Sequence, residues 1–334
     1  MGVWGQQPGR MPSGVAIPPG STGEVILKTE ALSKRYGTRL AVNCLNLEVY
    51  RGEVFGFLGP NGAGKTTTIR MLLNLIKPTA GYVSLFGQRL DRYAREVLPR
   101  VGALIEMPAF HPYLSGRDNL IAVAGLTGGV SEQRVDEVIA MVGLTGRDRD
   151  RYSSYSLGMR QRLGVGAALL TAPELLILDE PANGLDPAGI VEMRELIKRL
   201  PTMGITVFLS SHILAEVQQI CTRVAIIRLG ELIACSPVED LVRAGGVFAI
   251  ELEDLAGARA LLQSVPWIRS VHIEDNVLVV NAPGVRGRDL NRFLSNHGFI
   301  PDAIHRRSED LEQIFLAMTG TNENHSPQGG AVHV

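Results

Sequence analysis

The chain has 334 residues, of which 45% are apolar and 20% charged, and its formal net charge is −1. This composition is typical of a globular protein with a buried core, and the length allows one large domain and a smaller one. The balanced charge excludes a strong general attraction to polyanions, so we expect no nucleic acid among the partners.

Neither a membrane span nor a secretion signal is expected. No run of about 18 uncharged apolar residues occurs, and the N-terminus lacks the apolar core of a signal peptide. Cys44, Cys221 and Cys235 are scattered without CxxC spacing, which predicts small packing residues in a reducing compartment rather than a metal site. We therefore expect the protein in the cytosol unless a partner holds it at a membrane.

The first large region alternates strands and helices. Residues 1–22 are rich in Gly, Pro, Ser and Gln and are predicted to be a disordered leader. Beyond them, strands are predicted at 25–29, 45–49, 54–58, 175–178, 206–209 and 224–227, with helices at 64–75 and 190–200. Continuous apolar strands between helices predict an α/β fold with a largely parallel sheet, and the first strands predict an antiparallel edge subdomain.

Two further regions follow from the same pattern. Helical periodicity over about 107–166 predicts a helical subdomain inside a domain spanning 23–245. The next region predicts strands at 247–252, 268–273, 277–281 and 299–304, with helices at 255–263 and 288–296. This βαββαβ order predicts a small α+β, ferredoxin-like accessory domain over 246–320, including a last helix at 308–318, before a disordered tail at 321–334.

A phosphate-binding loop is the strongest local motif. The segment from Gly59 to Thr66 matches the pattern GxxxxGK[ST], and it lies between a predicted apolar strand and a predicted helix. Its glycines let backbone N–H groups turn inward around an anion, and the helix adds its positive N-terminal end. Lys65 is expected to reach the β- and γ-phosphates of ATP, and the Thr66 hydroxyl to ligate Mg²⁺. The predicted nucleotide-binding residues here are Gly59, Pro60, Asn61, Gly62, Ala63, Gly64, Lys65, Thr66 and Thr67.

Two consecutive acidic residues are candidates for holding the metal ion and for activating the attacking water. Four apolar residues, 175–178, form a strand that ends in Asp179 and Glu180, at the sheet edge where the phosphate loop lies. Asp179 is expected to hold Mg²⁺ through water, and Glu180 to polarise the attacking water.

With these motifs the chain resembles the ABC ATPase family over roughly residues 25–237. The resemblance implies that Tyr36, in Leu32-Ser-Lys-Arg-Tyr36-Gly37, stacks on adenine, and that His212, after Ser211, senses the γ-phosphate. Asp186, in Asn183-Gly-Leu-Asp186, matches the loop that communicates across the family's ATPase dimer. Glu180, His212 and Lys65 are thus the expected catalytic groups.

The segment Tyr155-Ser156-Leu157-Gly158-Met159 stands where the family carries its LSGGQ signature. The resemblance implies that Ser156 and Gly158 of one subunit contact ATP held by the other. Leu157 and Met159 replace the first Gly and the Gln of the signature, which changes the finer geometry of that contact.

Glu106 stands where most members carry a glutamine, and it is expected to reach the Mg²⁺ shell. This replacement, with the altered signature, resembles the bacitracin-export branch of bacterial ABC-2-type ATPases. That branch implies an ATP-hydrolysing subunit that energises export of a drug, antibiotic or lipid-like compound. Its partners would be a second ATPase subunit and an integral membrane subunit, which holds it at the cytoplasmic face and docks near Pro108, Phe110 and Leu114.

Two alternatives stay open from the sequence. A non-transport ABC ATPase would carry two cassettes in one chain or long coiled coils, and neither pattern occurs here. A nucleotide-dependent regulatory module without turnover would not need Glu180 and His212.

Overall fold

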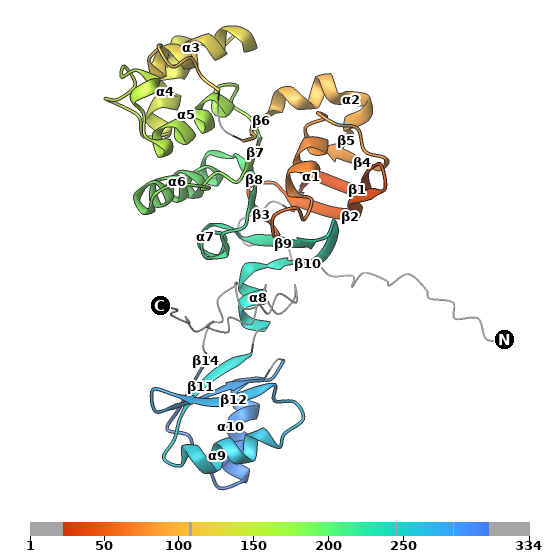
Figure 1. The fold of residues 1–334 in the computed structure, drawn as a ribbon, viewed down its shortest axis with the longest axis vertical. Coiled ribbons are helices and arrows are strands. Elements are labelled where there is room, and N and C mark those ends of the chain that lie inside the picture. The colour runs from red at the N-terminus through yellow and green to blue at the C-terminus, as the bar shows by residue number, and fades with distance from the viewer. Residues whose placement is uncertain (1–22, 107–108, 245, 283, 307–334) are drawn as a thin grey trace, which may run out of the picture.

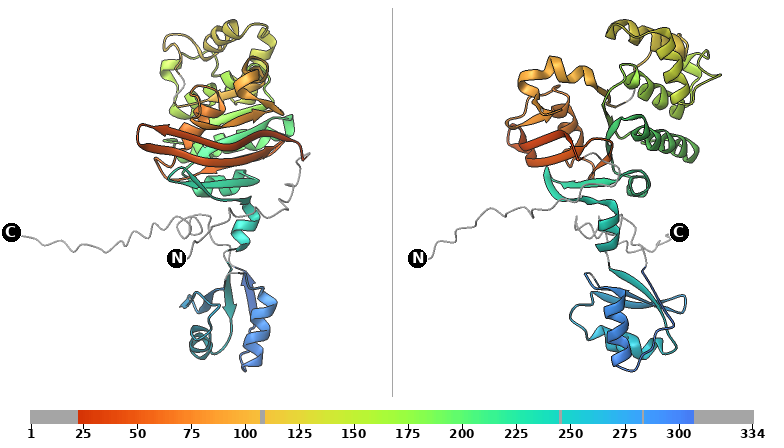
Figure 2. Two further views of the ribbon diagram at one scale, coloured as in Figure 1. Left: turned by 90° about the vertical axis from the view of Figure 1, so that its right-hand side faces the viewer. Right: turned by 180° about the vertical axis from the view of Figure 1, so that it is seen from behind.

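The computed structural model describes residues 23–106, 109–244, 246–282 and 284–306. Figure 1 shows two bodies along the long axis, joined through helix α8 (Val238–Ala244). The larger body holds two sheets and most of the helices, and the smaller one holds a third sheet with two helices (Figures 1 and 2).

A six-stranded sheet forms the centre of the larger body, in the order β10-β9-β3-β8-β7-β6. Five of its strands are parallel, and only β10 runs antiparallel, through a tight turn after β9. The parallel strands are almost entirely buried because helices or a second sheet cover both faces. The strands are β3 (Val54–Leu58), β6 (Val101–Leu104), β7 (Leu175–Asp179), β8 (Thr206–Ser211), β9 (Arg223–Arg228) and β10 (Glu231–Pro237).

Side chains of the parallel strands alternate between two cores. In β3, Phe55 and Phe57 belong to one core, whereas Val54 and Leu58 belong to the other. The first core contains helix α1 (Lys65–Leu72) and the antiparallel sheet, and the second contains the helices of the opposite face. Both faces of the central sheet are therefore fixed by packing, which holds its edges in place.

The antiparallel sheet has the order β2-β1-β4-β5, with β1 (Val25–Tyr36), β2 (Arg39–Tyr50), β4 (Ala80–Leu85) and β5 (Gln88–Arg89). The first two strands are much longer than predicted, because a bulge at Ala31 lets β1 continue to Tyr36. Helix α2 (Leu90–Val97) and a 3₁₀ turn (Leu98–Arg100) then lead to β6. None of the segments β4, β5, β6 and α2 was predicted from the sequence.

The predicted helical subdomain is α3 (Gly116–Thr127), α4 (Glu132–Met141) and the first part of α5 (Leu157–Leu169), with a 3₁₀ turn (Tyr152–Ser154) before α5. These helices gather at the end of the larger body away from α8 (Figure 1). Helices α6 (Pro187–Arg199) and α7 (Leu214–Ile220) cover the central sheet, with a 3₁₀ turn (Pro201–Met203) after α6.

The smaller body confirms the ferredoxin-like prediction. Its elements are β11 (Val247–Glu251), α9 (Leu255–Gln263), β12 (Ser270–Glu274), β13 (Val277–Asn281), α10 (Gly287–Asn296) and β14 (Ala303–Arg306). All strand pairs are antiparallel, in the order β12-β13-β11-β14, and the sheet shares a separate core with α9 and α10.

Some expectations from the sequence are wrong, and others concern residues outside the described ranges. Cys221 is buried as predicted, but Cys44 and Cys235 are exposed, so the packing role predicted for these two is wrong. The leader, the helix at 308–318 and the tail lie outside the described residues. Among the helices of the described ranges, none is long and apolar enough to cross a membrane.

Candidate nucleotide-binding site

The phosphate loop lies between β3 and α1, as the motif requires. Gly64 has a φ of 111° and precedes α1 as its N-cap, where a Cβ would lie 2.5 Å from the Ala41 carbonyl oxygen. Gly62 has a φ of 79°, also in the left-handed region that favours glycine. Pro60 accepts a bond from the Ala63 N–H at 3.1 Å, which closes the turn. The loop therefore presents the start of α1 to an open surface.

Lys65 connects the loop to the acidic strand. Its ammonium donates to the Gly59 carbonyl oxygen at 2.6 Å and lies 3.1 Å from a carboxylate oxygen of Glu180. The other Glu180 oxygen lies 2.7 Å from Nδ1 of His212. Three groups far apart in the chain thus meet at the carboxyl ends of β3, β7 and β8.

Glu180 occupies a backbone conformation that bulky residues rarely adopt. Its φ is 51°, directly after β7, and its N–H donates to the Ser210 hydroxyl at 3.0 Å. The same hydroxyl donates to Asp179 at 2.5 Å, and Asp179 is buried. Ser210 therefore fixes both acids, which is a role that the sequence analysis missed because the apolar strand pattern gives a serine no special weight.

An open pocket of about 440 Å³ lies beside this cluster. It is lined by Tyr36, Arg39, Ala41, Asn61, Gly62, Gly64, Lys65, Thr66, Thr67 and Glu180. Seven of these ten residues were predicted as nucleotide-binding and an eighth, Glu180, as catalytic. The lining does not include Gly59, Pro60 and Ala63 of the loop, nor Asp179 and His212.

Tyr36 and Arg39 form the outer wall of the pocket. They are paired across the turn between β1 and β2, and Tyr36 is 47% exposed, with the Lys34 ammonium 5.2 Å from its ring centroid. The exposed part of the ring can take part in stacking. The Arg39 guanidinium lies 3.5 Å from the Gly62 carbonyl oxygen, so it adds positive charge beside the phosphate loop. Arg39 was missed from the sequence because only the pairing of β1 with β2 brings it to the pocket.

The signature residues lie outside this pocket. Ser156 is the exposed N-cap of α5, and its hydroxyl accepts from the Met159 N–H at 3.2 Å. Gly158 is buried against α6, where a Cβ would lie 3.6 Å from the Gly189 Cα. Neighbouring Tyr155 anchors the turn: its hydroxyl donates to the Arg147 carbonyl, and burial raises its pKa to about 12.

Asp186 and Glu106 also lie away from the pocket lining. Asp186 is the N-cap of α6 and accepts from the Gly189 N–H at 3.0 Å. Glu106 follows β6 with a φ of 61°, and its exposed carboxylate lies 2.7 Å from the Arg70 guanidinium on α1. Within the single chain, Glu106 is therefore paired with a cation rather than directed at the acidic strand.

Comparisons with known proteins agree with this geometry. Residues 42–183 match the model of the ABC transporter family. The bacitracin transport ATP-binding protein BcrA of Bacillus licheniformis is 42% identical over 299 residues, covering 88% of this chain and 97% of that protein. The linearmycin resistance ATP-binding protein LnrL of Bacillus subtilis is 33% identical, covering 88% and 98% of the two chains.

A solved structure of an ATP-binding subunit of an ABC transporter is similar with a TM-score of 0.58 and 30% identity. The match covers 65% of this chain and 92% of the solved one. The chain therefore has a phosphate loop that faces an acidic residue, and it has the fold of such subunits. Its relatives are similar to it over most of its length. The chain belongs to the ABC transporter family, as an ATP-binding subunit that hydrolyses ATP.

Proposed function

We propose that this subunit energises export of an antibiotic or a similar compound through a separate integral membrane subunit. The names of its relatives, for bacitracin transport and linearmycin resistance, support the substrate class and the outward direction. The family's organisation supports a membrane partner that holds the subunit at the cytoplasmic face. Resistance to the exported compound is the expected benefit to the cell.

The proposed ATP contacts follow the pocket. Tyr36 stacks on adenine, and the backbone from Gly59 to Thr67 surrounds the phosphates with Lys65 at the β- and γ-phosphates. Mg²⁺ fits the oxygen donors nearby, with the Thr66 hydroxyl in the pocket wall and the buried Asp179 carboxylate acting through water. When bound, Mg²⁺ neutralises charge on the phosphates; Glu106 is a further oxygen donor if its contact with Arg70 opens.

Hydrolysis is assigned to Glu180, His212 and Lys65. Glu180 polarises the attacking water, and its hydrogen-bond distance to His212 supports a shared role at the γ-phosphate. Lys65 already lies beside Glu180 at 3.1 Å, and both face the open pocket. This convergence at one pocket wall is the observation that carries the proposed chemistry.

We also propose that two ATPase subunits enclose two ATP molecules. Ser156 and Gly158 stand at the start of α5, where backbone N–H groups and the helix dipole favour an anion, yet they do not line the pocket of their own chain. A second subunit would bring them to it. ATP closes the pair because the γ-phosphate then contacts both subunits, and hydrolysis removes that link. Asp186 lies at the same interface.

The proposed domain division is a nucleotide-binding domain at 23–245 and an accessory domain at 246–320. Within the first domain, the segment after Glu106 carries the surface for the membrane subunit. Phe110 is half-buried against Tyr152, and Leu114 is 37% exposed; Pro108 lies outside the described residues.

The test is capture of the closed complex. The Glu180→Gln variant, expressed with its native membrane and purified in mild detergent with ATP and Mg²⁺, should retain ATP and hold the dimer closed. A multi-helix membrane protein should co-purify with it. Glu174→Gln is the matched control, because Glu174 precedes the same strand at its far end. Recovery of ribosomes, DNA or the soluble protein alone would contradict the transporter assignment.

A further inference from the structure

We propose that Arg194 is a positioning residue for hydrolysis, which holds Glu180 and His212 against each other by joining helices α6 and α7. This inference rests on the proposed catalytic roles of these two groups. It does not depend on transport or on the exported compound.

Each catalytic group is connected through the chain to one of the two helices, His212 through Ile213 to α7 and Glu180 through residues 181–186 to α6. The Glu180 carboxylate and Nδ1 of His212 lie 2.7 Å apart, although 32 positions separate them in the chain. The pairing of β7 with β8 and the Ser210 hydroxyl fix the backbone near both groups. The position of His212, which lies beyond the end of β8 and just before α7, depends in addition on how α7 is held.

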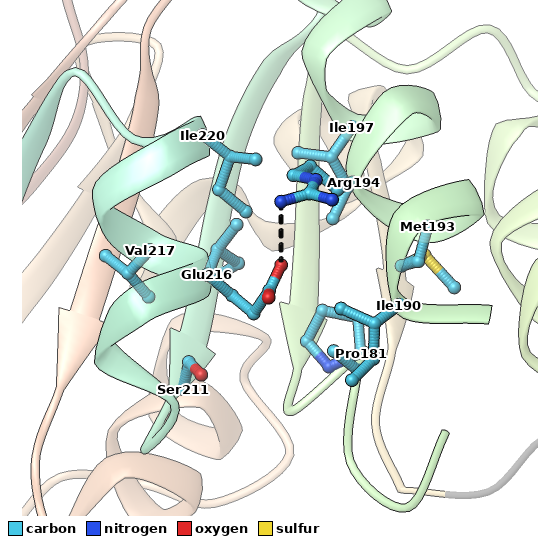
Figure 3. Close-up of a pocket in the computed structure, with 11 residues that line it drawn as sticks. Pro181, Ile190, Met193, Arg194, Ile197, Ser211, Glu216, Val217 and Ile220 are labelled. Carbon is cyan, nitrogen blue, oxygen red and sulfur yellow. Dashed lines mark ion pairs between the residues drawn. The ribbon is translucent and has the colours of Figure 1, made fainter. Parts of the chain in front are cut away.

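Between the two helices lies a largely apolar pocket (Figure 3). Pro181 and Ser211, the neighbours of the two catalytic groups, line it together with Ile190 and Met193 of α6 and Val217 and Ile220 of α7. The pocket is small, about 20 Å³, and Leu214 and Val217 of α7 are buried in the core on this side of the sheet. Helix α7 has only seven residues and no side-chain N-cap, so its position depends on its contacts with neighbouring elements.

Arg194 adds a polar connection between α6 and α7. From α6 its guanidinium reaches across the pocket to Glu216 at 3.8 Å and also contacts the Gln219 side chain, both on α7. Figure 3 shows the ion pair spanning the gap between the helices. The Arg194 and Glu216 side chains are only 16% and 18% exposed, so solvent screens this pair less than a surface pair.

Together with the chain itself, these contacts form a closed ring of connected residues and helices. It runs from Glu180 through α6 and Arg194 to Glu216, and back through α7 to His212. Opening the ring at Arg194 lets α7 shift and moves His212 relative to Glu180. Of the residues in this ring, only Glu180 lines the ATP pocket, and the phosphate loop and Tyr36 lie on other elements, so the affinity for ATP should not change.

The experiment compares hydrolysis with binding in the purified full-length chain. For Arg194→Ala we expect kcat to fall about 10- to 100-fold, because a small displacement of catalytic groups costs that much. The Kd for ATP and the fraction of binding-competent protein should match the wild type. Lys198→Ala is the matched control: Lys198 is on α6 and pairs with Glu195 at the exposed surface, so its removal should leave kcat unchanged.

Two further variants separate positioning from folding. The exchange Arg194→Glu with Glu216→Arg restores an ion pair across the pocket and should recover most of the lost kcat. Adding Arg194→Ala to a His212→Ala chain should cause no further loss, because the residue acts through His212. A merely structural role predicts additive losses and a lower fraction of binding-competent protein.

The outcomes are distinguishable. If Glu180→Gln and His212→Ala lose activity while Arg194→Ala keeps it, the positioning role is wrong and the proposed chemistry stands. If Glu180→Gln and His212→Ala themselves retain activity, the catalytic assignment fails first. If Arg194→Ala weakens ATP binding as much as hydrolysis, the positioning role is likewise overturned.

Discussion

Acidic and basic residues lie at both ends of the parallel strands of the six-stranded sheet, but their surroundings differ. We call the side where the strands end the carboxyl edge, and the side where they begin the amino edge. At the carboxyl edge, Lys65 and Glu180 face an open pocket, and Glu180 keeps a left-handed backbone angle. At the amino edge, Glu53 and Arg223 are buried together, with 3.1 Å between the carboxylate and the guanidinium. The charged groups of the first edge pair with each other beside an open pocket and can therefore meet a ligand, whereas Glu53 and Arg223 pair with each other in the buried interior.

A second cluster at the amino edge repeats this pattern. Glu174, just before β7, lies 2.5 Å from Arg100 and 2.8 Å from Arg51, and Arg51 also holds Glu24 at 2.6 Å. Strand β7 thus begins at a saturated ion-pair network and ends at a catalytic acid. We therefore expect substitutions at the carboxyl edge to affect ATP hydrolysis and substitutions at the amino edge to affect the stability of the fold.

The largest expected effect is at the carboxyl end of β7. Glu180→Gln should lower kcat about 10²- to 10⁴-fold, because the amide cannot accept a proton from water. The unfolding midpoint in urea should not fall. Phosphate release measures the first quantity. Glu174→Gln, the same change at the other end of the strand, should leave kcat at the wild-type value; equal losses in both variants would break the comparison.

The next effect is at the buried amino-edge pair. Arg223→Met should lower the free energy of unfolding by about 3–5 kcal/mol, because it leaves the Glu53 carboxylate buried without its cation. Burial already raises the pKa of Glu53, and Arg223 opposes that shift. Urea unfolding measures the loss, and adding Glu53→Gln should recover part of it. An Arg223→Met chain of native stability but impaired hydrolysis would contradict the assignment of this edge.

Tyr36→Ala tests the rim of the pocket. Loss of a stacking ring should weaken ATP binding by about 1–3 kcal/mol, the usual range for base–aromatic contacts. The value of kcat at saturating ATP should not change, because the ring is assigned to adenine and takes no part in the proposed hydrolysis. Titration with ATP measures the affinity, and Tyr36→Phe should retain it. A selective fall in kcat would show that the ring acts elsewhere.

The smallest effect concerns pH. The hydrogen bond from Arg100, with help from Arg51, lowers the pKa of Glu174 to about 2 from an ordinary value of 4.5. Because the folded pKa is the lower one, the stabilisation is complete above 4.5 and is lost as pH falls towards 2. The Glu174→Gln variant should therefore have a lower free energy of unfolding than the wild type at pH 6. Between pH 4.5 and 2, its free energy of unfolding should change less with pH than that of the wild type. Urea unfolding at a series of pH values tests this, and parallel curves for wild type and variant would refute it.

Local spacing determined much of the candidate site. The motif from Gly59 to Thr66, between an apolar strand and a helix, and the apolar run ending in Asp179 and Glu180 each depend on neighbours in sequence. Their meeting follows from a parallel sheet, which gathers the carboxyl ends of its strands at one edge. The βαββαβ order of the smaller body was readable for the same reason, since its strands and helices have clear and different periods.

Other features of the fold carried too weak a local signal. Strands β4 and β6 were missed because Gly81 and Gly102 interrupt short runs, and pairing with β1 and β7 is what makes them strands. The true length of β1 was hidden by the bulge at Ala31.

By itself, therefore, the sequence determined the fold class, the phosphate loop, the acidic strand and the membership of a nucleotide-hydrolysing family. Only the tertiary structure decided that Arg39 lines the pocket, that Ser210 holds both acids, that Glu106 pairs with Arg70, and that Arg194 joins α6 to α7. The physical reason is distance along the chain. A motif of consecutive residues fixes its own backbone, whereas each of these contacts exists only after packing brings separate elements within hydrogen-bond or ion-pair range.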